Sequence, residues 1–108
     1  MSSEQLSGQK ITEQSLMNNP VVQKSIRRLR KLGLKVYVEP KDEDSLVMVV
    51  DNLSIIETIK RMVNNAITYK KHDVVHDRMN NVLVIAMWRG EKPKWVETLK
   101  TREMLKSQ

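Results

Sequence analysis

Two short apolar runs constrain the fold of this chain more than any other feature. Val82–Trp88 reads VLVIAMW and is the most apolar stretch, and Ser45–Val50 reads SLVMVV. Both have strand length and are apolar at successive positions, which is typical of interior strands with two buried faces. Neither approaches the roughly 20 apolar residues needed to cross a bilayer. We therefore predict two central strands and no membrane-spanning segment.

Each central strand is preceded by a segment that we predict to be its hairpin partner. Leu34–Glu39 alternates apolar and polar residues, as a half-buried strand does, and the charged turn Lys41–Asp44 joins it to the first central strand. Asp73–His76 is predicted to be a short edge strand. A tight turn at Asn80 and Asn81 follows it, because Asn tolerates positive φ. Two hairpins are therefore expected.

Three helices complete the predicted pattern. Pro20–Gly33 has Pro in its first turn, Asn18 or Asn19 as a cap, and Gly33 where a left-handed residue is needed. A second helix begins near Ser54, which forms a possible capping box with Glu57. Two adjacent apolar rows, built from Ile55, Ile56, Ile59, Met62, Val63, Ala66 and Ile67, make it the core helix. The third helix, Lys94–Lys106, follows Pro93 and packs through Trp95, Val96, Leu99 and Met104.

The order of these elements predicts an α+β fold of the form helix–hairpin–helix–hairpin–helix. Its four-stranded antiparallel sheet is expected to carry the helices on one face. Residues 1–17 are predicted to be a flexible polar N-terminal arm, and residues 18–108 a single domain. An alternative reading makes Thr12–Met17 a helix, as in a helix-turn-helix. The excess apolar surface of the sheet favours a homodimer that forms across the open face or an edge.

Charge and composition restrict the class of partner. The chain has 108 residues, 19 Lys and Arg against 13 Asp and Glu, a net charge of +6 and a pI of about 9.7. This balance favours polyanionic partners. The absence of Cys excludes disulfides and thiolate metal sites, and with no export signal it favours an intracellular, cytoplasmic protein. Few Gly and many charged residues suit a heat-adapted source.

The helix at Pro20–Gly33 is the candidate functional element. Val22, Ile26 and Leu29 are expected to face the core, which leaves a cationic face without any acidic residue. We interpret this face as a non-catalytic nucleic-acid-binding surface, with DNA slightly preferred because no RNA-specific motif is visible. The alternative is an ordinary solvated face. The candidate binding residues are Lys24, Arg27, Arg28, Arg30, Lys31, Lys35, Lys70 and Lys71.

Two partial resemblances offer other interpretations. The segment LRKLGLKVYVEP, Leu29–Pro40, resembles a recognition helix entering the wing of a winged-helix domain. Asp42, Glu43 and Asp44 at the tip of that wing oppose phosphate contact. The helix–hairpin order resembles the core of LAGLIDADG homing endonucleases, but the helix motif that supplies their catalytic acid is absent from Pro20–Gly33. A metal-dependent nuclease is therefore a weaker alternative.

A histidine pair and a tryptophan pair are two further candidate sites. His72 and His76 lie in HDVVHD, but a metal site needs at least a third ligand, so a solvated polar segment is preferred and no metal or cofactor is expected. Trp88 and Trp95 flank the loop RGEKPK, where packing of the last helix is favoured over stacking on bases. The remaining alternative function is a protein-interaction or regulatory module that uses an apolar sheet face.

Overall fold

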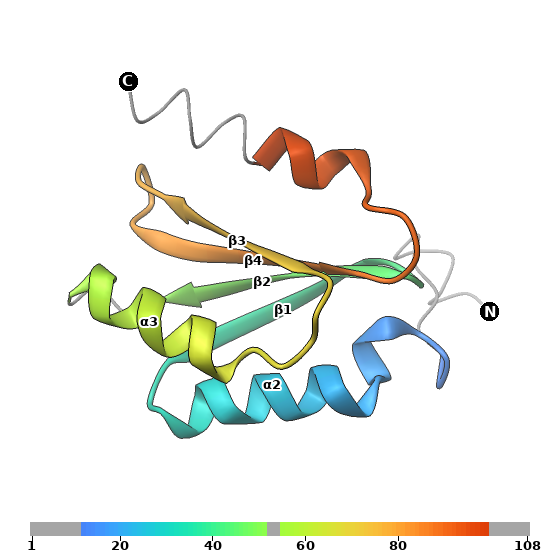
Figure 1. Ribbon diagram of the computed structural model, residues 1–108, viewed down its shortest axis with the longest axis horizontal. Helices are drawn as coiled ribbons and strands as arrows, with labels where there is room; N and C mark the ends of the chain where they lie inside the picture. The colour runs from blue at the N-terminus through green and yellow to red at the C-terminus, as the bar shows by residue number, and fades with distance from the viewer. Residues whose placement is uncertain (1–11, 52–54, 100–108) are drawn as a thin grey trace, which may run out of the picture.

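The computed structural model describes residues 12–51 and 55–99 (Figure 1). Its four strands form one antiparallel sheet in the order β1-β2-β4-β3. The elements are η1 (Leu16–Asn18), α2 (Pro20–Lys31), β1 (Lys35–Asp42), β2 (Ser45–Asp51), α3 (Ile56–Ala66), β3 (His72–Asp77) and β4 (Val82–Trp88), and residues 94–99 are also helical. The predicted α+β class and four-stranded antiparallel sheet are confirmed. Within the described ranges, no helix has the length and apolar character that a membrane span requires.

The ends of α2 follow the predicted signals. The Oδ1 atom of Asn19 accepts hydrogen bonds from the backbone N–H groups of Val21 at 2.8 Å and Val22 at 3.4 Å. Pro20 occupies the first helical position, where no N–H is required. Gly33, just beyond the last turn, has φ of 90°, a backbone conformation that is sterically unfavourable for residues with a Cβ atom. Local chemistry therefore fixes where α2 begins and ends.

The main core lies between the sheet and the layer formed by α2 and α3 (Figure 1). From the sheet, β2 and β4 contribute Leu46, Met48, Val50, Leu83, Ile85 and Met87, each at most 1% exposed. From the helices come Val22, Ile26, Leu29, Ile59, Val63 and Ala66. The predicted inward face of α2 is therefore confirmed, and the two apolar runs are the two interior strands.

The last helix does not lie on the predicted side. Residues 94–99 pack on the opposite face of the sheet from α2 and α3 (Figure 1), so the expectation of helices on one face only was wrong. Val96 is fully buried there against Ala86 and Trp88. The reason is that β4 is apolar on both faces. Ala86 and Trp88 alternate with the residues of the main core, so they lie on the opposite face and require a second layer to bury them.

The chain before α2 also packs more closely than an arm would. The predicted arm ended at residue 17, yet Leu16 is fully buried and Ser15 is 2% exposed. The N–H of Leu16 donates to the C=O of Glu43 at 2.7 Å, which ties η1 to the turn between β1 and β2. Of the alternative first helix at Thr12–Met17, only the short 3-10 helix η1 is present. The predicted cap at Ser54 lies outside the described residues.

Candidate nucleic-acid interface

Four cationic side chains form one exposed stripe on α2. Lys24, Arg27, Arg28 and Lys31 are all exposed, and their spacing of three, four and seven residues places them on one side of the helix. At a rise of 1.5 Å per residue, the stripe is about 10 Å long. We call these four residues the α2 surface.

The cations of the α2 surface differ from several others in having no carboxylate partner in the described part of the chain. By contrast, Lys60 lies 3.8 Å from Glu57, and Arg89 lies 2.8 Å from Asp44. Lys60 and Arg89 are therefore partly neutralised by neighbouring carboxylates. No carboxylate of the described residues neutralises the α2 surface in this way.

Lys92 forms ion pairs with two carboxylates. Its Nζ atom lies 2.9 Å from a carboxylate oxygen of Glu97 and 3.0 Å from one of Asp73. The hydrogen bonds that Lys92 donates to Glu97 and, to a smaller extent, to Asp73 raise the pKa of Lys92 above its ordinary value. These pairs join β3 to the helical segment 94–99, so Lys92 has a structural role.

Arg30 and Lys35 stand apart from the α2 surface. The Nη2 atom of Arg30 donates to the backbone C=O of Val36 at 2.9 Å, so this guanidinium connects α2 to the outer edge of β1. Lys35, the first residue of β1, is exposed just beyond the end of α2. Arg30 therefore makes a contact within the protein, and its contact with nucleic acid stays a prediction.

The loop that follows α3 brings a second pair of cations to the start of α2. The backbone N–H of Thr68 donates to the Oγ of Ser25 at 2.9 Å, and the two hydroxyl oxygens are 3.0 Å apart. Lys70 and Lys71 then line a shallow pocket together with Val21 of α2. Lys71 donates from Nζ to the C=O of Gly90 at 3.0 Å, whereas Lys70 is exposed beside the helix.

A groove that sequence analysis missed lies between the C-terminal halves of α2 and α3. Its volume is about 370 Å³, and its lining is mostly apolar with cations on one side. The lining residues are Arg28, Lys31, Leu32, Met62, Asn65 and Ala66. One signal for the groove is present in the sequence, because Leu32 is apolar but falls outside the inward row of α2. Leu32 is 47% exposed.

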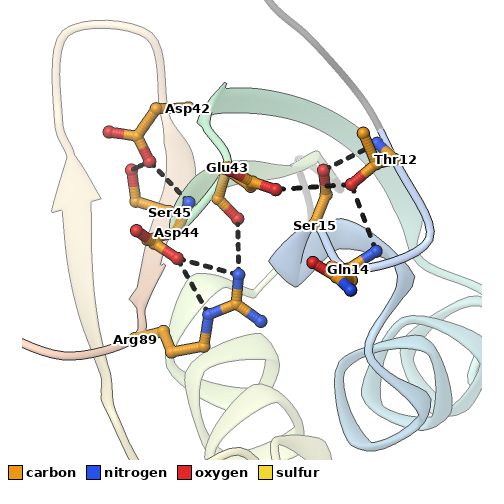
Figure 2. Close-up of polar contacts among 8 residues, drawn as sticks. All are labelled: Thr12, Gln14, Ser15, Asp42, Glu43, Asp44, Ser45 and Arg89. Atoms are coloured by element: carbon orange, nitrogen blue, oxygen red, sulfur yellow. Dashed lines mark hydrogen bonds and ion pairs between the residues drawn. The ribbon is translucent and has the colours of Figure 1, made fainter.

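The acidic hairpin turn is held against the body of the protein (Figure 2). Arg89 donates from Nε and Nη2 to the Oδ1 of Asp44 at 2.9 and 2.8 Å, and from Nη2 to the C=O of Glu43 at 3.1 Å. On the other side, the hydroxyl of Thr12 donates to a carboxylate oxygen of Glu43 at 3.4 Å. A projecting wing would be free of such contacts, so this geometry does not support the winged-helix resemblance.

The two histidines occupy separate environments. His72 contacts the backbone C=O of Tyr69 through Nδ1, whereas the Nε2 of His76 lies 3.3 Å from the Oδ1 of Asn81. Across residues 12–51 and 55–99, no group of three or more His, Cys, Asp or Glu side chains is placed to hold a metal ion.

The two tryptophans lie at the second sheet face. Trp88 is 8% exposed in the small core with Val96, and Trp95 packs against the same core. Lys92 lies 5.5 Å from the ring centroid of Trp88, and Lys41 lies 5.9 Å from that of Trp95. Both rings are therefore used in packing the last helix, as the packing interpretation expected.

The predicted binding residues thus fall into three groups. The α2 surface is continuous and uncompensated, Lys35 and Lys70 are exposed near its two ends, and Arg30 and Lys71 make contacts within the protein. No family model, curated protein or solved structure matches this chain.

Proposed function

We propose that this protein binds nucleic acid without catalysing a reaction, and that the α2 surface contacts the phosphates. The observation that carries the proposal is the stripe of Lys24, Arg27, Arg28 and Lys31, exposed and without a carboxylate partner in the described chain. Duplex DNA has about one negative charge per 1.7 Å of its axis, so a stripe of about 10 Å lies along several phosphates. Guanidinium groups also bind phosphate oxygens bidentately. An intracellular location is part of this proposal.

A simpler explanation for part of the stripe is helix stability. Arg28 and Lys31 lie in the last turn of α2, where cations interact favourably with the negative end of the helix dipole. This effect falls off within one turn, so it does not account for Lys24 and Arg27. Binding of a polyanion accounts for all four residues.

The groove beside α2 adds a place for an unpaired base. Arg28 and Lys31 lie on its rim, Leu32 and Met62 give it apolar walls, and Asn65 supplies an amide. An Arg guanidinium can stack on a base, and an amide can hydrogen bond to a base edge. This groove is a reason to compare single strands with duplex DNA, since the slight preference for DNA over RNA does not distinguish the two forms.

Binding of labelled oligonucleotides, followed by fluorescence anisotropy at several salt concentrations, tests the proposal. Duplex DNA, single-stranded DNA and RNA of equal length are compared. We expect binding at low salt and a linear fall of log K with log salt, by about 0.9 per phosphate contact on duplex DNA and about 0.7 on single strands. Failure to bind any of the three at low salt, or affinity that does not change with salt, contradicts the proposal.

A protein-interaction module is a second candidate, and the sheet face opposite α2 favours it. Tyr37, at 59% exposure, is in cross-strand register with Val49, which pairs with Val84, and Val84 pairs with Val75. These three valines are only half-buried among the described residues. Salt-insensitive capture of a protein partner, abolished by Tyr37→Glu, would support it. Cleavage of DNA that requires a divalent metal would instead support the nuclease alternative.

A further inference from the structure

β3 is an outer strand of the sheet, and its pairing shows which of its backbone groups face outward. The N–H of Trp88 donates to the C=O of Lys71 at 3.2 Å, so the backbone of Lys71 points into the sheet. Because this direction alternates along a strand, the N–H and C=O groups of Val74 and His76 point away from the sheet. These outward groups have no hydrogen-bond partner in residues 12–51 and 55–99.

The opposite edge of the sheet is protected. Along β1, the outward C=O of Val36 accepts the hydrogen bond from Arg30, and Pro40 has no N–H to offer. Proline, charged side chains and covered backbone groups are the usual means by which proteins prevent pairing at a sheet edge. The two edges therefore differ, and only β3 presents consecutive outward residues with both donors and acceptors unused.

We propose that a second copy of this chain pairs with β3 in the antiparallel direction, with Val74 opposite Val74 of the partner subunit. The N–H of each Val74 then meets the C=O of the other, and the N–H of His76 meets the C=O of His72 of the partner subunit. The charged side chains on β3 and next to it favour this register over the alternative one. It places Lys71 opposite Asp77 of the partner subunit, and opposite charges across strands are stabilising.

The register in which the partner strand slides by two residues, which moves the two-fold axis by one residue, makes similar backbone hydrogen bonds. It places Val75 opposite Val75 of the partner subunit, and Asp73 opposite Asp77 of the partner subunit. Two carboxylates directly across a strand pair repel each other. Charge therefore favours the first of the two registers.

The proposed dimer has a consequence for the α2 surface. Two antiparallel strands in one sheet are related by a two-fold axis perpendicular to that sheet, so each face of one subunit continues into the same face of the other. Both copies of α2 therefore lie on the same side of an enlarged sheet. One polyanion that spans the dimer contacts two α2 surfaces, which raises its affinity through multivalency.

Two matched proline substitutions test the pairing in the absence of nucleic acid. Val74 and Val38 have outward N–H groups on opposite edges of the sheet, and both side chains are partly buried against the main core. By sedimentation equilibrium, we expect wild type and Val38→Pro to be dimeric at roughly 100 μM, in the range of weak association, and Val74→Pro to be monomeric. A monomeric wild type, or a Val74→Pro protein that is folded by circular dichroism and still dimeric, overturns the proposal.

Single cysteines test the register, since the natural chain has none. Across the two-fold axis, paired Cα atoms are about 5.5 Å apart, within the range that a disulfide spans. We expect mild oxidation to cross-link Val74→Cys and to leave Val75→Cys as separate chains. The reverse result overturns the register, and no cross-linking of either variant overturns pairing through β3. Neither measurement depends on nucleic-acid binding, so this inference and the proposed function can fail separately.

Discussion

The hydroxyl oxygen of Ser25 lies 3.0 Å from that of Thr68, although the two residues belong to α2 and to the loop that follows α3. Ser25 is fully buried, and it also accepts a hydrogen bond from the backbone N–H of Thr68 at 2.9 Å. This contact fixes the loop that carries Lys70 beside α2. One small polar residue on the inner face of the helix thus positions cations that are distant in sequence.

Replacing Ser25 with Ala tests this contact. The backbone N–H of Thr68 would lose its acceptor in a partly buried position, and we expect the free energy of unfolding to fall by about 1–3 kcal/mol. Urea denaturation measures the change. Thr58→Ala, at an exposed position of α3, is the control and should change the free energy by no more than about 0.5 kcal/mol. Equal effects of the two substitutions would show that the contact contributes nothing specific.

The second sheet face gives a further prediction about stability. Val96 is fully buried against Ala86 and Trp88, so Val96→Ala should cost about 1.5–3 kcal/mol, the range for burial of such a side chain. The fluorescence of Trp88 and Trp95 should shift to longer wavelength as water reaches the rings. Thr98→Ala, exposed in the same helical segment, is the control. Unchanged stability and fluorescence in Val96→Ala would contradict packing of this helix on the sheet.

Alkaline conditions should destabilise the protein through Tyr69. Burial raises the pKa of Tyr69 above its ordinary value of 10.0; the charge of Arg89 lowers the pKa and that of Asp44 raises it by smaller amounts. A raised pKa means that the folded state holds the proton more tightly than the unfolded state. Its stabilising effect is therefore complete below pH 10.0 and is lost as the pH rises through the folded-state pKa.

Tyr69→Phe isolates this contribution. Phenylalanine has no proton to lose, so the fall in the free energy of unfolding between about pH 9 and about pH 12 should be less steep than in wild type. Denaturant unfolding at a series of pH values measures both slopes. Lys92, whose pKa is also raised, should keep part of the slope in the variant. Identical slopes would mean that Tyr69 titrates alike in both states.

The elements that sequence analysis placed well are those with strong local signals. The boundaries of β4 match the predicted strand because seven apolar residues end at a charged loop. α2 matches because Asn19, Pro20 and Gly33 mark its ends. The turn before β4 also behaves as predicted, since Asn81 has φ of 55°.

The features that sequence analysis missed depend on contacts between distant segments. Leu16 precedes α2 in a polar stretch, and nothing local indicates that the turn at Glu43 would bury it. Arg30 looked equivalent to its neighbours, but the path of β1 offers it the C=O of Val36. The groove beside Leu32 exists only because α3 packs next to α2. Such relationships depend on tertiary structure and have no periodic signal in the chain.

Two triple variants test whether the α2 surface, and not net charge alone, binds nucleic acid. Replacing Arg27, Arg28 and Lys31 with Ala should preserve the fold, because all three are exposed and Ala is the strongest helix former. The control replaces Lys41, Arg78 and Lys94 with Ala. These exposed cations lie outside α2, and their removal changes the net charge by the same amount.

The most direct measurement is the slope of log K against log salt for duplex DNA in wild type and in both triple variants, each checked for folding by circular dichroism. We expect the α2 variant to bind more weakly, with a slope that is less steep by about one unit for each lost phosphate contact. The control variant should retain most of the wild-type slope. Equal losses in both variants, or an unchanged slope in a folded α2 variant, would contradict binding through the α2 surface.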